Sequence, residues 1–182
     1  MSQTEKFSPF AIPLKMGVLI ALVKIILSTI QYQFFAEQMT TNLVVSFLSF
    51  VLGVILLYVT GSKQRKAMGG FIEIKQAFQA MFVAILIFVI VGFLYDLLYQ
   101  HVIDPTLTER IKTSTISFAE KMGAPQEKLD EMAEQFDEQQ RKSTDIGTLS
   151  LSLFSMIVWY SIIGFIMAAI LKKRKPIVDS YN

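Results

Sequence analysis

Four long apolar stretches dominate the pattern of hydrophobic and polar positions along the chain. They cover residues 13–33, 43–59, 77–98 and 146–171. The shortest has 17 residues, which at about 1.5 Å per residue gives a helix of about 26 Å, close to the thickness of a bilayer core. Hydrocarbon offers no partners for backbone amides, and the stretches lack the alternation of barrel strands. The pattern therefore predicts an all-α polytopic membrane protein, a single membrane domain over residues 1–182 with four transmembrane helices.

The polar region between the third and fourth stretches, residues 104–142, predicts two short amphipathic helices. Asp104 followed by Pro105 is typical of an N-cap and the first helical residue. Gly123 is expected to end this helix, and Pro125 to begin the second. Apolar residues recur on one face of each helix: Leu107, Ile111, Phe118 and Met122 in the first, and Leu129, Met132, Ala133 and Phe136 in the second. Each stripe needs a partner, which could be the other helix, the membrane surface or a second subunit.

The charges are segregated along a chain that is 53% hydrophobic and only 18% charged. Residues 104–145 carry ten acidic residues against six basic ones, whereas basic residues gather before the first stretch, between the second and third, and after the fourth. Cytoplasmic loops are rich in Lys and Arg. We therefore expect both termini in the cytoplasm and the acidic helical hairpin outside it. The first stretch is too long for a secretory signal and is expected to be a retained anchor.

The composition also excludes several kinds of chemistry. Cysteine is absent and histidine occurs once, which removes disulfides and makes haem, iron–sulfur or histidine-based metal sites improbable. No hydrolytic triad, zinc helix or phosphate-binding loop is present in the sequence. We expect no cofactor, no metal, no nucleic-acid partner and no catalytic residue.

Lys24 is the most unusual residue, because it lies about 16 Å along the first predicted helix from Pro13, where a lysine costs about 2.5–3.5 kcal/mol. Gly17, Ser28 and Gln31 fall on the same side of that helix. Lys24, Ser28 and Gln31 form a candidate intramembrane polar site, which could line an ion or substrate path. The alternative, which we favour here, is that Lys24 snorkels or is satisfied locally in the fourth span, by hydroxyls such as Ser155 or by stacking on Trp159 or Tyr160.

Asp96, His101 and Asp104 form a second candidate cluster, at the outer interface. His101 could pair with Asp104 if the third helix continued to Pro105, and a histidine there would respond to pH. The alternative, again favoured, is a helix that leaves the membrane into polar solvent.

Small residues recur at helix-packing spacing in all four stretches: Gly17 and Ala21, Ser49 and Gly53, Ala80 and Ala84, and Gly164 and Ala168. Such pairs let helix backbones approach closely. Four helices enclose only a small core, so a homo-oligomer is a secondary expectation.

Several segments in this order resemble one family. They are the run from Gly69 to Phe78, the apolar third stretch, Asp104-Pro105, the run from Gly123 to Leu129, and a last stretch that closes on Lys-Lys-Arg-Lys. The chain resembles the small inner-membrane proteins of Bacteroidota known as domain of unknown function forty-one ninety-nine, over roughly residues 10–175. The resemblance implies a bacterial inner membrane and four helices, and it supplies no activity.

The leading functional expectation is a non-enzymatic scaffold or interaction protein of the cell envelope. Its acidic hairpin would contact a second copy or an envelope partner through residues 107–136, and the lipid bilayer would surround the rest. The alternative is a small transporter or channel subunit with Lys24 near the permeation path. The two differ in whether Lys24 is accessible to water.

Overall fold

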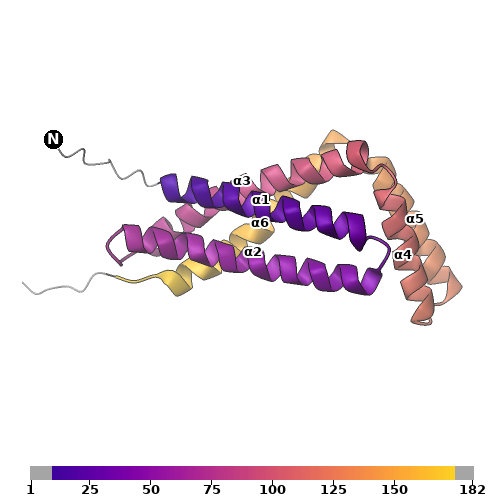
Figure 1. Ribbon diagram of the computed structural model, residues 1–182, viewed down its shortest axis with the longest axis horizontal. Coiled ribbons are helices and arrows are strands. Elements are labelled where there is room, and N and C mark those ends of the chain that lie inside the picture. The colour runs from indigo at the N-terminus through magenta and orange to yellow at the C-terminus, as the bar shows by residue number, and fades with distance from the viewer. Residues whose placement is uncertain (1–9, 175–182) are drawn as a thin grey trace, which may run out of the picture.

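The computed structural model describes residues 10–174 and is entirely helical apart from turns and one isolated backbone bridge. The helices are α1 (Ala11–Phe34), α2 (Met39–Ala67), α3 (Ile74–Leu98), α4 (Leu107–Lys121), α5 (Gln126–Lys142) and α6 (Ile146–Leu171). Figure 1 shows the four long helices running side by side and the α4–α5 hairpin at one end of them. The predicted all-α fold, with four spans and two shorter helices between the third and fourth, is confirmed.

Each predicted apolar stretch lies within one long helix; the first three helices are longer than their stretches, and α6 has the predicted bounds. α2, for example, continues through polar residues to Ala67. The four helices, the third counted as far as Ile103, are long and apolar enough to cross a membrane. Their outward side chains include Phe47, Trp159 and Ile170, at 65%, 59% and 64% exposed. In a water-soluble protein such large exposed apolar faces are rare, whereas hydrocarbon covers them at no cost.

α3 is the central helix of the bundle and packs against α1, α2 and α6. It buries eight residues, whereas α6 buries three. Gly17 of α1 allows a close approach to α3, because a Cβ there would lie 3.1 Å from the Cα of Ala84. Gly164 has the same role in α6, where a Cβ would lie 2.9 Å from Ile85 Cδ1. Three of the four small-residue pairs are buried in this way, and Ser49 with Gly53 is the exception.

The turns follow local sequence signals. Gly69 and Gly70 both have positive φ, 82° and 88°, in the turn between α2 and α3, a conformation that glycine adopts without strain. Asp145 caps α6 by accepting a hydrogen bond from Thr148 N at 2.8 Å. Ile72 and Lys173 exchange two backbone hydrogen bonds of 2.9 and 3.0 Å, which fasten the end of α6 to the α2–α3 turn.

The hairpin ends its first helix at Gly123, as expected, with φ of 82°. Leu129 is buried and the rest of the α5 stripe is half-buried, with α4 packed against α5. The stripes are thus covered mainly within the chain, by the other helix of the hairpin and, for Leu107 and Ile111, by the bundle. Met122 is the exception, at 74% exposed. Leu107 at the start of α4 is fully buried with Ala36 and Tyr99, which seats the hairpin on the bundle.

The predicted start of the hairpin was wrong. α4 begins at Leu107 after Thr106, and the backbone of Asp104 lies outside the helix. A π-helical turn, Tyr99–Ile103, closes α3 instead. The Asp104 side chain accepts hydrogen bonds from Thr106 N and Oγ1, at 3.1 and 2.6 Å, and so shapes the turn before the helix.

Candidate functional site

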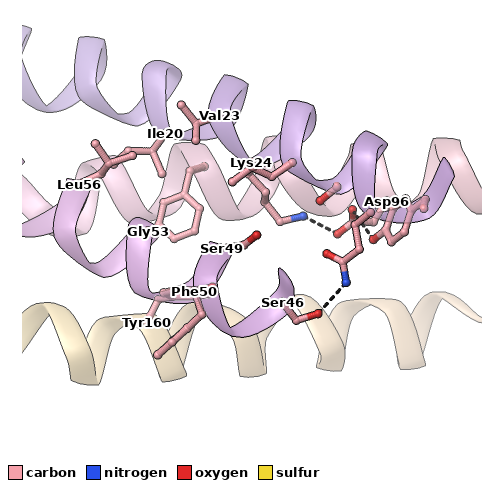
Figure 2. Close-up of a pocket in the computed structure, with 15 residues that line it drawn as sticks. Ile20, Val23, Lys24, Ser46, Ser49, Phe50, Gly53, Leu56, Asp96 and Tyr160 are labelled. Carbon is pink, nitrogen blue, oxygen red and sulfur yellow. Dashed lines mark hydrogen bonds and ion pairs between the residues drawn. The ribbon is translucent and has the colours of Figure 1, made fainter. Parts of the chain in front are cut away.

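An ion pair joins α1 to α3 within the apolar spans. Lys24 Nζ lies 2.6 Å from Asp96 Oδ2, and the two side chains are 32% and 20% exposed. Tyr32, two turns further along α1, donates its hydroxyl to the other carboxylate oxygen, Asp96 Oδ1, at 3.1 Å. Figure 2 shows the lysine amine directed at Asp96. The pairing compensates the charge of a lysine that lies near the middle of its helix.

Gly92, one turn before Asp96 on α3, provides the path for the lysine. A Cβ on Gly92 would lie 2.5 Å from Lys24 Cδ, 2.9 Å from Cε and 3.0 Å from Nζ. These distances are shorter than van der Waals contact, so the lysine stem lies directly on the glycine backbone. A side chain at this position would displace the outer part of Lys24, so Gly92 leaves room for the lysine in its present path to Asp96.

A second polar contact joins α1 to α2. Gln31 Nε2 donates to Asn42 Oδ1 at 2.5 Å and to Ser46 Oγ at 2.6 Å. On another side of α1, Thr29 Oγ1 forms a hydrogen bond with the hydroxyl of Tyr95 in α3. Hydrogen bonds of this kind hold transmembrane helices together, because hydrocarbon offers no competing partner.

A cavity of about 290 Å³ lies between these contacts. Side chains of α1, α2, α3 and α6 line it, and its polar wall consists of Lys24, Ser28, Gln31, Ser46, Ser49 and Asp96. Phe50, Phe88 and Tyr160 form an aromatic corner, in which the Phe88 and Tyr160 rings meet edge to face at 4.8 Å. Lys24 and Asp96 are the charged residues in this wall, and their charges cancel.

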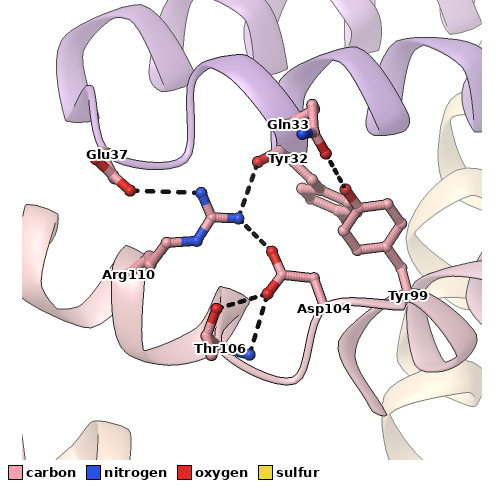
Figure 3. Close-up of polar contacts among 7 residues, drawn as sticks. All are labelled: Tyr32, Gln33, Glu37, Tyr99, Asp104, Thr106 and Arg110. Atoms are coloured by element: carbon pink, nitrogen blue, oxygen red, sulfur yellow. Dashed lines mark hydrogen bonds and ion pairs between the residues drawn. The ribbon is translucent and has the colours of Figure 1, made fainter. Parts of the chain in front are cut away.

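A separate ion cluster lies beyond the spans, where the hairpin meets the bundle. The Arg110 guanidinium donates to Asp104 Oδ2, to the Tyr32 carbonyl at 3.4 Å and to Glu37 Oε1 at 3.5 Å. Figure 3 shows these three bonds radiating from one side chain. Hydrogen bonds from the Thr106 hydroxyl, and then from Arg110, lower the pKa of Asp104 below its usual value. Arg110 therefore fastens α4 to the α1–α2 end of the bundle.

Tyr32 takes part in both clusters. Its hydroxyl binds Asp96, its carbonyl accepts from Arg110, and its ring lies 4.9 Å from the ring of Tyr99. Tyr99 in turn donates its hydroxyl to Gln33 Oε1 at 3.2 Å. One residue thus links the ion pair inside the spans to the base of the hairpin.

The structure brings the first predicted group together and separates the second. Lys24, Ser28 and Gln31 all line the cavity, as their common helix face predicted. Asp96 is instead the partner of Lys24, and Asp104 binds Thr106 and Arg110. His101 is exposed in the π-helical turn, because α3 does not continue as a regular helix to Pro105.

The local partners considered for Lys24 were the wrong ones. Trp159 is 59% exposed on the outer face of α6, and Ser155 is also exposed. Tyr160 lines the cavity, but its ring packs edge to face on Phe88, and the Lys24 amine is directed at Asp96. Sequence reasoning also missed Arg110 and Gly92. A usable signal was present, since Asp96 is the acidic residue in the apolar stretches and Lys24 the basic residue furthest from a stretch end. Among the described residues, no group of three or more His, Cys, Asp or Glu side chains could hold a metal ion.

The helical architecture and the apolar outer faces define a multi-pass membrane protein with a polar site between its spans. The family described as Protein of unknown function (DUF4199) matches residues 14–173, and the chain belongs to that family. The predicted family is therefore confirmed, while the bacterial group and the inner membrane stay predictions. No curated protein and no solved structure matches the chain.

Proposed function

We propose that this protein binds a small solute in the cavity between its spans, as a non-enzymatic small transporter or channel subunit. The observation that carries the proposal is the Lys24–Asp96 pair in the wall of that cavity. Ionisable residues within membrane spans are costly, and where they occur they most often mark a substrate or ion path. The cavity is at the lower end of the size range of small-molecule sites, about 300–1,000 Å³.

The scaffold function loses part of its motivation. One argument for it was that each apolar stripe of the hairpin needs a partner, and α4 and α5 pack against each other while Leu107 and Ile111 pack on the bundle. What remains is the acidic outer face of α5, with Glu127, Asp130, Glu131, Glu134 and Glu138 exposed. Cross-linking from an exposed position such as Glu131→Cys would test it, and capture of one defined envelope partner, or of a second copy, would revive it.

The orientation we propose places the basic end of the bundle in the cytoplasm of a bacterial cell, with the membrane being the inner one. Lys63, Lys66, Lys75, Lys172 and Lys173 are exposed at this end, where α2 and α6 end and α3 begins. Glu37 and the hairpin lie at the other end. The positive-inside rule supports this orientation, and the ends of α1 and α6 that lead to the two termini are then both cytoplasmic.

Water access to the cavity tests the proposed function. The chain has no cysteine, so a single introduced thiol reports its own position. Ser49→Cys places a thiol in the cavity wall, and the neighbouring Leu48→Cys places one on the outer face, where Leu48 is 60% exposed toward lipid. We expect a membrane-impermeant, charged thiol reagent to label the first variant and not the second.

Labelling from each side of oriented vesicles in turn identifies the opening of the cavity. Reaction of the Ser49→Cys variant from either side, with protection by a bound solute, supports a solute pathway. If both variants remain unlabelled until the membrane is dissolved, the cavity is sealed, and Lys24–Asp96 is a helix clamp with no transport role.

A further inference from the structure

We infer that the solute taken by this cavity is an uncharged, single-ring molecule that presents a carbonyl-type oxygen to Lys24. The inference rests on the proposed function and adds the chemical class of the ligand. It is drawn from the charge of the cavity wall, its unused hydrogen-bonding capacity, its two-sided polarity and its volume.

The charge of the wall favours a neutral ligand. Lys24 and Asp96 compensate each other at 2.6 Å, and the cavity lining contains no further charged residue. An anion or a cation entering this space would leave one net charge between apolar spans, at a desolvation cost of several kcal/mol. A neutral molecule avoids that cost.

Lys24 is the charged hydrogen-bond donor of the wall and has donor capacity to spare. A lysine amine has three N–H groups, and Lys24 gives one to Asp96. Asp96 already accepts one hydrogen bond at each oxygen, from Lys24 and from Tyr32. The Gln31 amide nitrogen is committed to Asn42 and Ser46. A ligand that offers an acceptor to Lys24 uses this spare capacity, and a neutral carbonyl oxygen would accept a charge-assisted hydrogen bond from the ammonium.

The rest of the cavity suits an apolar ring. Figure 2 shows Ile20, Val23 and Leu56 on the side of Lys24 away from Asp96 and Ser46, with Phe50 and Tyr160 below. Phe88 and Tyr160 already meet edge to face, and a third ring can extend such an arrangement. A cavity of about 150 Å³ holds benzene, so the 290 Å³ here admits one substituted ring and excludes a whole lipid.

Three isosteric probes test the inference with the full chain in lipid nanodiscs, by titration calorimetry against empty nanodiscs. Acetophenone carries the ring and the carbonyl, α-methylstyrene replaces the oxygen with a methylene group, and benzoate adds a negative charge. We expect saturable binding of acetophenone at one site per chain, with a Kd about tenfold or more below that of α-methylstyrene, because a hydrogen bond to an ammonium is lost. Benzoate is expected to bind no better than α-methylstyrene.

The matched variant is Lys24→Met/Asp96→Leu, which removes both charges together and so leaves no unpaired ion. It should abolish the preference for acetophenone over α-methylstyrene, which is read as the ratio of the two Kd values within this variant. Absence of saturable acetophenone binding to the natural chain overturns the inference, as does tighter binding of benzoate. The proposed function is judged separately by labelling of Ser49→Cys, so a labelled cavity that rejects acetophenone retains a solute pathway and discards this ligand class.

Discussion

Two ion pairs in this protein have similar geometry and lie in different surroundings. Lys24–Asp96 joins α1 to α3 inside the spans, with side chains 32% and 20% exposed, and Arg110–Asp104 joins the hairpin to the bundle beyond them, with side chains 29% and 20% exposed. The exposed fractions are nearly equal. The surroundings of the exposed atoms differ. The first pair borders a cavity between apolar helices, whereas the second lies among exposed polar residues.

The comparison indicates that the surroundings of an ion pair, more than its N–O distance, determine how much it contributes to the stability of the protein. Two charges in water gain little from each other, typically about 0–1 kcal/mol, because solvent already stabilises each of them. Within a membrane the separated charges have no such solvent, so breaking a pair by removing one partner costs about 3–5 kcal/mol. The following predictions test whether this distinction holds here.

The largest effect is expected for Lys24→Met, which leaves Asp96 without its cation. We expect the free energy of unfolding to fall by about 3 kcal/mol, because a cavity between apolar spans does not solvate a carboxylate as bulk water does. SDS-titration unfolding in mixed micelles, followed by circular dichroism, measures this change.

The control for this prediction is the double variant Lys24→Met/Asp96→Leu. Replacement of a whole buried pair by apolar residues is often nearly neutral, so the double variant should recover most of the lost stability. If single and double variants were equally unstable, the loss would come from packing of the lysine stem, and the ion pair would have little weight of its own.

Gly92→Ala is expected to have an intermediate effect. The new Cβ would lie 2.5 Å from Lys24 Cδ, and since that atom is in the middle of the lysine stem, the side chain must leave its path to Asp96. Overpacking of this kind costs about 1–3 kcal/mol. Gly53→Ala on α2 is the matched control, because a Cβ there meets no atom within 4 Å. In the Lys24→Ala background, which removes the atoms beyond Cβ, the cost of Gly92→Ala should shrink, and an unchanged cost would mean that Gly92 is needed for another contact.

Arg110→Met should produce a smaller, local effect. Loss of the bonds to Asp104 and Glu37 is expected to destabilise the docking of α4 by about 1 kcal/mol, and less at high salt. Hydrogen exchange of the α4 amides measures this opening, with the amides in the middle of α3 as the internal reference. An effect as large as that of Lys24→Met would remove the distinction between the two pairs.

Low pH should also weaken the docking of α4 through the Arg110–Asp104 ion pair. The pKa of Asp104 is lowered in the folded protein, so its contribution is complete above the pKa of the unfolded chain, about 3.9, and is lost as the pH falls through the lower folded value. Protection of α4 should therefore be constant from pH 7 to 5 and decline below about pH 4. In Asp104→Asn this decline should be absent, because the group that titrates has been removed.

Features that depend on neighbouring residues in the sequence could be predicted. The spans could be predicted because the length of an apolar stretch depends only on consecutive residues. The turn between α4 and α5 could be predicted because glycine and proline, here Gly123 and Pro125, favour turns and helix ends whatever surrounds them. The face shared by Lys24, Ser28 and Gln31 follows from helix periodicity alone, and all three do line the cavity.

Partners across helices could not be predicted in the same way. Asp96 is 72 residues from Lys24, and helix periodicity does not say which face of α3 meets α1. The π-helical turn at Tyr99–Ile103 rotates the following residues away from the regular i, i+4 face, so the pairing of His101 with Asp104, the less favoured of the two alternatives, does not form and His101 is exposed. Arg110 looked like an ordinary base in a charged insert, since its importance depends on where the hairpin docks.

The smallest effect is expected for a third pair, Lys142–Glu138, within α5. Lys142 Nζ lies 2.6 Å from Glu138 Oε1, the same distance as in Lys24–Asp96, and the side chains are 58% and 54% exposed. The hydrogen bond from Lys142 lowers the pKa of Glu138, yet both groups lie in the open. We expect Glu138→Gln to leave thermal unfolding and α5 hydrogen exchange unchanged within error. Because two lysine–carboxylate pairs of equal length are compared, a measurable loss here would show that contact distance, and not the surrounding medium, sets the weight of ion pairs in this protein.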